Sequence, residues 1–366
     1  MEYMQFTAVV LMTLLTLKLL LLPGKVSVNP AANKSRWMMM AGTIALVFQF
    51  LLQLIFGLRA MGVTQAAMLN LALFIPCSWM FSLSVIYLQR KGSVTWLDKY
   101  LGALCWGVSL TLLGVAAAID GEPLLSDTTE LRWAEMLSSA IYIFMQGYYT
   151  NRHILRMRAI QNAMEDYYDN DMACVVHWMQ LGVIIPPVMA LMVPLLIYCP
   201  LQIVLAICGI VFFVAIFFLI DSFSSFVMSS APKKIQEAES NSDEEETTAS
   251  TSLSTEALQR VERAIESWLE KRGYLQCGLT MPTAADAIGV PRYLLSSWLR
   301  QQDLRYSEWM TNLRIDEAKR IIMAHRDWSN ESVAQHCGFS DRSYFQKKFK
   351  EKTGISPADY QTLEEV

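Results

Sequence analysis

Long apolar runs fill the first part of the chain and restrict its fold more than any other feature. An α-helix needs about 20 apolar residues to cross the hydrocarbon core of a bilayer. Runs of about this length lie at residues 3–22, 37–58, 66–88, 100–119, 132–150, 174–198 and 200–220. The chain is 53% hydrophobic and only 17% charged, whereas a soluble protein carries about 25% charged residues. We therefore predict a seven-helix transmembrane bundle over residues 1–221. Six spans are the alternative, because Arg132 and Glu135 lie at the edge of the fifth run.

Lysine and arginine are distributed unevenly over the predicted connections. Cytoplasmic loops of membrane proteins are enriched in these residues. With seven spans, one side of the membrane receives Lys25, Lys34, Arg36, Arg90, Lys91, Lys99, Arg152, Arg156, Arg158, Lys233 and Lys234. The opposite side receives only Arg59 and Arg132. The bias predicts a multi-pass membrane protein with the N-terminus outside and the C-terminal domain in the cytoplasm.

Polar residues inside the apolar runs are few and mostly neutral. Gln49, Gln53, Gln146 and His177 are the main examples, and neutral glutamines favour hydrogen bonds between spans over a functional site. No cluster of charged residues lies in the middle of a run, which argues against an ion-coupled transporter. The predicted outer connections are short, so a signal would reach the protein through the bundle, a membrane sensor protein or a lipophilic ligand.

Two segments connect the apolar runs to the rest of the chain. Residues 151–171 start basic and end acidic, with apolar residues between. They are compatible with an amphipathic helix on the membrane or on a neighbouring domain, but we favour a solvated extension of the fifth span. Residues 222–254 change composition abruptly to Ser, Thr and acidic residues, and such a composition predicts a disordered linker.

The C-terminal stretch from Ser329 to Tyr360 has the pattern of two helices joined by a sharp turn. Glu331 to His336 reads as a short helix capped by Ser329 or Asn330, and Gly338 supplies the turn. Ser340 is the expected cap of a second helix, whose apolar residues recur at helical spacing. Basic and amide side chains remain on its outer face, as in a helix-turn-helix whose second helix enters the major groove.

At these residues the sequence resembles the AraC/XylS-type transcriptional regulators. The resemblance rests on Gly338-Phe339-Ser340, Tyr344-Phe345, Phe349-Lys350, Thr353-Gly354, Ser356-Pro357 and Tyr360, with Leu313-Arg314-Ile315-Asp316-Glu317-Ala318 similar to the family's linker-helix motif. It covers residues 255–362. It implies an all-α domain over 255–366 with two helix-turn-helix units, the first at Thr280 to Arg300, joined by a long helix from Ser307 to His325.

The resemblance also implies which side chains meet DNA. In the first unit the implied groove-facing residues are Arg292, Tyr293, Ser296, Ser297 and Arg300. In the second unit Arg342 and Lys347 suit guanine edges and Gln346 suits adenine. Ser343 shares that outer face, and Ser340, Lys348 and Lys350 are expected on phosphates. The first unit departs from the family at Ser297, Leu299 and Leu304, so we expect it to contribute affinity more than base specificity.

Together the apolar runs and the resemblance predict a transcriptional regulator embedded in the bacterial inner (cytoplasmic) membrane, which is not an enzyme. We find no metal-ligand spacing among the Cys and His residues and no nucleophile–base arrangement, so we expect no cofactor and no metal. The expected partners are double-stranded promoter DNA and the lipid bilayer, with RNA polymerase and a second copy of the chain as further candidates. Two alternatives stay open: a transporter or membrane enzyme that carries a regulatory domain, and a passive anchor whose sensor is another protein.

Overall fold

The structure is a computed structural model of the whole chain. It describes residues 2–22, 31–57, 63–119, 126, 128–169, 180, 184–188, 190–192, 202–228, 233–235, 237–239 and 255–362. These residues form helices and turns, and the described part contains no β-strand. The predicted all-α fold class is therefore confirmed. The chain divides into unit 1, residues 1–158 and 175–233, and unit 2, residues 159–174 and 234–366.

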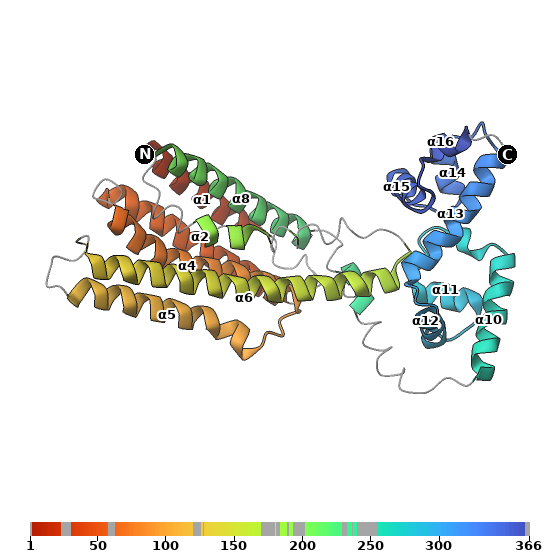
Figure 1. The fold of residues 1–366 in the computed structure, drawn as a ribbon, viewed down its shortest axis with the longest axis horizontal. Coiled ribbons are helices and arrows are strands. Elements are labelled where there is room, and N and C mark those ends of the chain that lie inside the picture. The colour runs from red at the N-terminus through yellow and green to blue at the C-terminus, as the bar shows by residue number, and fades with distance from the viewer. Residues whose placement is uncertain are drawn as a thin grey trace. The chain divides into compact units, whose positions relative to one another are not determined.

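Unit 1 is built from long helices (Figure 1). In chain order they are α1 (Glu2–Leu21), α2 (Ala31–Phe56), α4 (Val63–Gln89), α5 (Trp96–Ile119), the first part of α6 (Thr129–Tyr167) and α8 (Gln202–Met228). Helix α2 packs against α1 and α4, α4 also packs against α5, and α1 contacts α8. The helices correspond to six of the seven predicted runs, and most of the remaining run, 174–198, lies outside the described residues together with His177.

Four helices of the described part are long and apolar enough to cross a membrane. They are Ala31–Phe56, Ala67–Gln89, Trp96–Ile119 and Ile207–Met228. Helix α1 is apolar over Gln5–Leu21 but shorter, and α6 continues into a strongly polar segment. The structure thus supports four spans, and the predicted count of seven stays a prediction.

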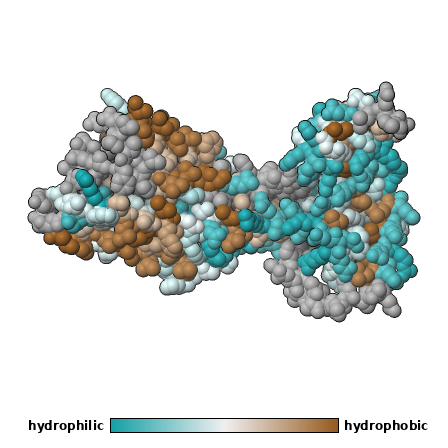
Figure 2. Space-filling model, in the orientation of Figure 1, coloured by the Kyte–Doolittle hydropathy of each residue, from teal (hydrophilic) through white to brown (hydrophobic). Residues whose placement is uncertain are grey.

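Unit 1 combines buried polar side chains with an apolar surface. Gln49 and Gln53 on α2 are fully buried, and both donate to Asn70 Oδ1 on α4, at 2.8 and 2.7 Å. Large apolar side chains face outward instead, among them Phe48, Ile55, Leu104, Val115, Phe144 and Phe218. Figure 2 shows apolar patches on the visible face of this unit. The glutamines therefore join helices, as the sequence predicted for Gln49 and Gln53.

Unit 2 contains two small helical cores joined by one long helix (Figure 1). Its elements are α10 (Thr255–Glu270), the 3-10 turn η1 (Gly273–Leu275), α11 (Met281–Ile288), α12 (Arg292–Gln301), α13 (Tyr306–Ala324), α14 (Asn330–His336), α15 (Arg342–Thr353) and α16 (Pro357–Gln361). The start of α13 belongs to the first core, with Trp268 stacked on Trp309 at 5.8 Å between ring centroids. The rest of α13 belongs to the second core, around Phe345 and Phe349.

Two boundaries differ from the prediction. Helix α8 runs to Met228, past the expected end at 221, because Phe223, Phe226 and Val227 continue its buried apolar side. Part of the expected disordered linker is helical: residues 233–235 and 237–239 form helical turns, in which Ile235 and Ala238 are buried. Residues 240–254, which hold most of the acidic run, lie outside the described residues.

The segment after the fifth run also differs from the favoured interpretation. Helix α6 continues without interruption from the fifth apolar run to Tyr167, so this segment does extend the helix of that run. However, one face of its last part is buried. Ile160 and Met164 are buried, and residues 159–174 belong to unit 2. The end of α6 is therefore part of the C-terminal unit.

Candidate DNA-binding surface

Helices α14 and α15 form the tight pair that the sequence predicted. Ser329 caps α14, because its Oγ accepts from Ser332 N at 3.1 Å. Gly338 makes the turn with a φ of 82°, in the left-handed region that a residue with a Cβ adopts only with strain. The buried Phe339 ring then packs on Phe345 at 5.2 Å between ring centroids. This turn fixes the direction in which α15 leaves the core.

The cap of α15 corrects one assignment. Asp341, and not Ser340, is the N-cap residue, and its Oδ1 accepts from Tyr344 N at 2.7 Å. Both residue types are good caps, and the turn geometry decides between them. Ser340 is exposed one position earlier, where its hydroxyl remains free for the predicted phosphate contact.

The outer face of α15 carries the predicted contact residues. Arg342, Ser343, Lys347 and Lys350 are exposed, and Gln346 and Lys348 are partly exposed. Lys348 Nζ lies 2.9 Å from Glu351 Oε2, which holds the pKa of Glu351 below its ordinary value. The opposite face buries Phe345 and Phe349 completely. The helix thus presents cations and an amide outward from a rigid support, as a helix that reads a groove requires.

The first helix pair, α11 and α12, repeats this geometry with fewer charges. Gly289 makes its turn with a φ of 83°, and Pro291 is the N-cap residue of α12. The implied groove-facing residues differ in exposure: Tyr293 and Arg300 are exposed, Arg292 and Ser297 are partly exposed, and Ser296 is buried. Ser296 faces a space that also borders Asp166, so its burial argues against the groove-facing role.

Helix α13 connects the two pairs through buried charged residues that sequence reasoning did not single out as functional. Arg314 and Glu317 belong to the linker-helix motif, and both are buried. Glu317 Oε1 lies 2.6 Å from Arg320 Nη2 and 3.4 Å from Arg272 Nη1. At the far end of α15, Lys352 Nζ lies 2.9 Å from Glu308 Oε1 at the start of α13. The pairs of Glu317 with Arg272 and of Glu308 with Lys352 thus join α13 to the segment after α10 and to the end of α15.

Comparison with known proteins places this geometry in a family. A family model described as a helix-turn-helix domain matches residues 284–362. Residues 284–362 form an AraC-type helix-turn-helix domain. No solved structure matches the chain.

Curated relatives match about a quarter or less of the chain. The regulatory protein PocR of Salmonella typhimurium is 31% identical over 70 residues, which are 19% of this chain and 23% of that protein. The HTH-type transcriptional regulator GadX of Escherichia coli is 32% identical over 82 residues, 22% of this chain and 30% of that protein. An uncharacterised HTH-type regulator of Escherichia coli, YijO, is 29% identical over 98 residues, 26% of this chain and 34% of that protein. The chain thus spans about a third or less of each of these relatives.

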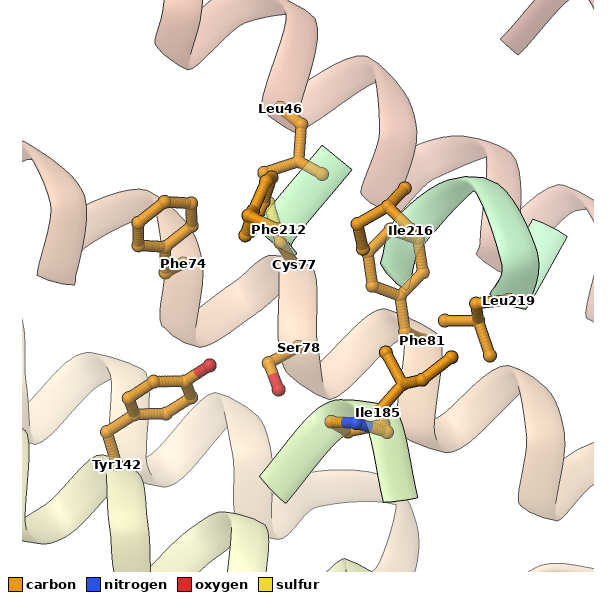
Figure 3. Close-up of a pocket in the computed structure, with 11 residues that line it drawn as sticks. Leu46, Phe74, Cys77, Ser78, Phe81, Tyr142, Ile185, Phe212, Ile216 and Leu219 are labelled. Atoms are coloured by element: carbon orange, nitrogen blue, oxygen red, sulfur yellow. The ribbon is translucent and has the colours of Figure 1, made fainter. Parts of the chain in front are cut away.

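Unit 1 contains a small, partly open pocket among its helices (Figure 3). Its volume is about 20 Å³, which is room for roughly one water molecule. Tyr142 and Ser78 bring hydroxyl groups to a lining that otherwise consists largely of apolar side chains such as Phe74 and Ile216. A lipophilic ligand would have to displace these side chains in order to enter. Among the described residues no group of His, Cys, Asp and Glu could hold a metal ion.

Proposed function

We propose that the chain is a membrane-embedded transcriptional regulator, in which unit 1 lies in the cytoplasmic membrane and unit 2 binds promoter DNA through α12 and α15. The observation that carries this proposal is the contrast between the surfaces of the two units: unit 1 exposes many large apolar side chains, whereas among the described residues of the DNA-binding domain Tyr293 is the one large apolar side chain that is exposed. Unit 1 buries Gln49, Gln53 and Asn70 and exposes apolar residues, an arrangement suited to lipid. Unit 2 buries its apolar residues and carries an AraC-type domain.

Exposed tryptophans support the membrane part of the proposal. Tryptophan is enriched at both interfaces of membrane proteins. Trp37, Trp96 and Trp133 are exposed at 49%, 75% and 69%. Trp37 and Trp96 adjoin the basic connections assigned to the cytoplasm, and Trp133 adjoins the opposite side. The tryptophans therefore lie at both expected interfaces of the bundle, and the basic residues favour the orientation with the C-terminal unit in the cytoplasm.

Charge distribution supports the DNA-binding part. Lys and Arg residues number the same as Asp and Glu residues over residues 255–366, so nonspecific attraction to DNA should be modest. The exposed face of α15, in contrast, carries Arg342, Lys347 and Lys350 close together. Specific contacts by these side chains would supply the affinity.

Reporter fusions test the proposal. Green fluorescent protein fused after Val366 should fluoresce, because it fluoresces only in the cytoplasm. Alkaline phosphatase inserted between 120 and 128 should be active, because it is active only outside the cytoplasm. Chromatin capture with the full-length protein should enrich discrete promoter fragments. A phosphatase active after Val366 would contradict the proposal, because the DNA-binding unit could not reach the chromosome.

A further inference from the structure

Asp169, two residues after the end of α6, forms a buried ion pair in unit 2. Arg314 Nη2 donates to Asp169 Oδ2 at 2.7 Å, and the two side chains are 0% and 1% exposed. The same carboxylate oxygen accepts from Leu279 N at 2.9 Å. Beside it, Tyr168 forms an isolated β-bridge with Thr280, the cap of α11. Asp169 is therefore bound both to α13 and to the loop that leads into the first helix-turn-helix.

Arg314 links this site to both halves of the DNA-binding unit. Its Nε donates to Tyr274 O at 2.9 Å and its Nη2 to Gln276 O at 2.7 Å, both in the first half. Its guanidinium lies 5.9 Å from the ring centroid of Phe339, in the core of the second half. A single buried cation thus contacts the two parts whose separation decides how α12 and α15 meet DNA.

Asp169 supplies the charge that this buried cation needs. Two carbonyl groups alone would leave the guanidinium without a counter-ion in an apolar surrounding, which is unfavourable. Glu317, one turn further along α13, is already paired with Arg320 and Arg272. Among the ion pairs of the described residues, Asp169 is thus the carboxylate that pairs with Arg314.

Exposed contacts extend the interaction back along α6. Arg305, which precedes α13, lies 3.4 Å from Glu165 Oε2 and 3.6 Å from Asp166 Oδ1. Its Nη2 donates to Asn162 Oδ1 at 3.0 Å. Such solvated pairs contribute little individually. They nevertheless show that the polar side of α6 fits this surface over more than one turn.

We infer that the segment Ala159–Asp169 is a built-in binding partner of the DNA-binding unit, with Asp169 as the residue that positions Arg314 between the two helix-turn-helix halves. We name this contact the Asp169 clasp. Thr129–Arg158 of the same helix belong to unit 1. Helix α6 therefore connects unit 1 to the clasp, and this connection is separate from the linker. The closed clasp holds α12 and α15 in their DNA-binding arrangement, and its release lowers affinity for a two-part operator. The effect on DNA rests on the function proposed above, whereas the contact itself does not.

The test compares Asp169→Asn with Asp327→Asn in the full chain, reconstituted in lipid nanodiscs. Asp327 is exposed in the loop between α13 and α14, outside the segment Ala159–Asp169, so its variant removes the same charge without touching the clasp. Hydrogen exchange of the amides at 277–281 and 337–340 should accelerate at least about tenfold in Asp169→Asn and remain unchanged in Asp327→Asn. Affinity for a genomic fragment selected with the wild-type protein should fall by about the same factor in Asp169→Asn only.

Wild-type protection at 277–281 in Asp169→Asn would overturn the clasp, and accelerated exchange there without a change at 337–340 would overturn its link to the second half. If exchange rises throughout unit 2, the double variant Asp169→Asn/Arg314→Met shows whether the two side chains are coupled. If they are, the free energy of unfolding of the double variant should be no lower than that of Asp169→Asn alone. Additive losses of stability would contradict the clasp. A wild-type protein that protects Leu279 but binds no DNA fragment would refute the proposed function and leave the contact standing.

Discussion

Arg342 begins α15 with its side chain exposed, directly after the Asp341 cap that fixes the start of the helix. A guanidinium at this position can donate two parallel hydrogen bonds to a guanine edge. We expect Arg342→Ala to weaken binding to the selected operator by about 1–3 kcal/mol, which is roughly 5- to 150-fold in Kd. Titration of the full-length protein against labelled operator would measure this loss.

A second arginine provides the control for that experiment. Arg263 is also exposed, but it lies on α10, away from the predicted contact residues. Arg263→Ala removes the same charge and should change affinity by less than about twofold. Equal losses in the two variants would mean that only net charge matters and that Arg342 reads no base.

Two cysteines of unit 2 should differ in reactivity. Cys337, at the end of α14, is fully buried, and burial raises the pKa of its thiol to about 12. Cys277 is exposed in the loop before α11. Because the thiolate is the reactive form, we expect maleimide at neutral pH to label Cys277 and to leave Cys337 unmodified until unit 2 unfolds. Mass spectrometry of the labelled peptides checks this, and equally fast labelling of Cys337 would contradict its burial.

At the scale of the elements, the turn between α14 and α15 depends on its glycine more than the equivalent turn between α11 and α12. Both Gly338 and Gly289 have positive φ angles, of 82° and 83°. A Cβ on Gly338 would meet Leu275 O at 2.4 Å and Arg314 Nε at 3.1 Å, whereas a Cβ on Gly289 meets nothing within 4 Å. Replacing either glycine by alanine would therefore strain the backbone, but only the alanine at 338 would also clash with Leu275 O.

We therefore expect Gly289→Ala to destabilise its half by about 1 kcal/mol and Gly338→Ala to destabilise the second half by about 2–3 kcal/mol. Native-state hydrogen exchange of the α12 and α15 amides in the full chain would report the two opening free energies. If both variants cost the same, the approach of Leu275 to Gly338 does not contribute to stability.

The elements of unit 2 were predictable because their signals are local. A glycine between two apolar patterns specifies the turn at Gly338, and the spacing of Phe345 and Phe349 specifies the buried face of α15. The burial of Ser296 was not predictable, because it depends on how α12 packs and not on its own spacing. The pair of Asp169 and Arg314 joins residues 145 positions apart, so no local pattern could indicate it.

For the whole molecule, α6 is the element that enters both units. In unit 1 its Arg152 pairs with the buried Asp98 through two hydrogen bonds, each of 2.9 Å. In unit 2 the segment that follows it ends in the Asp169 clasp. Between these two ion pairs the chain is helical as far as Tyr167. A rotation or shift of the helix in one unit therefore has a continuous helical path into the other.

Insertions between Arg158 and Ala159 test whether this path carries the signal. Each added residue rotates an α-helix by about 100° and lengthens it by about 1.5 Å. Seven added alanines change the phase by only about 20°, whereas five change it by about 140°. We expect transcription from a target promoter to stay near the wild-type level with seven alanines and to change by about tenfold with five. The same five residues inserted within 241–254 serve as the control and should have little effect. Output that is independent of phase, or equally sensitive to the linker insertion, would mean that α6 does not control the DNA-binding unit and that unit 1 acts only as an anchor.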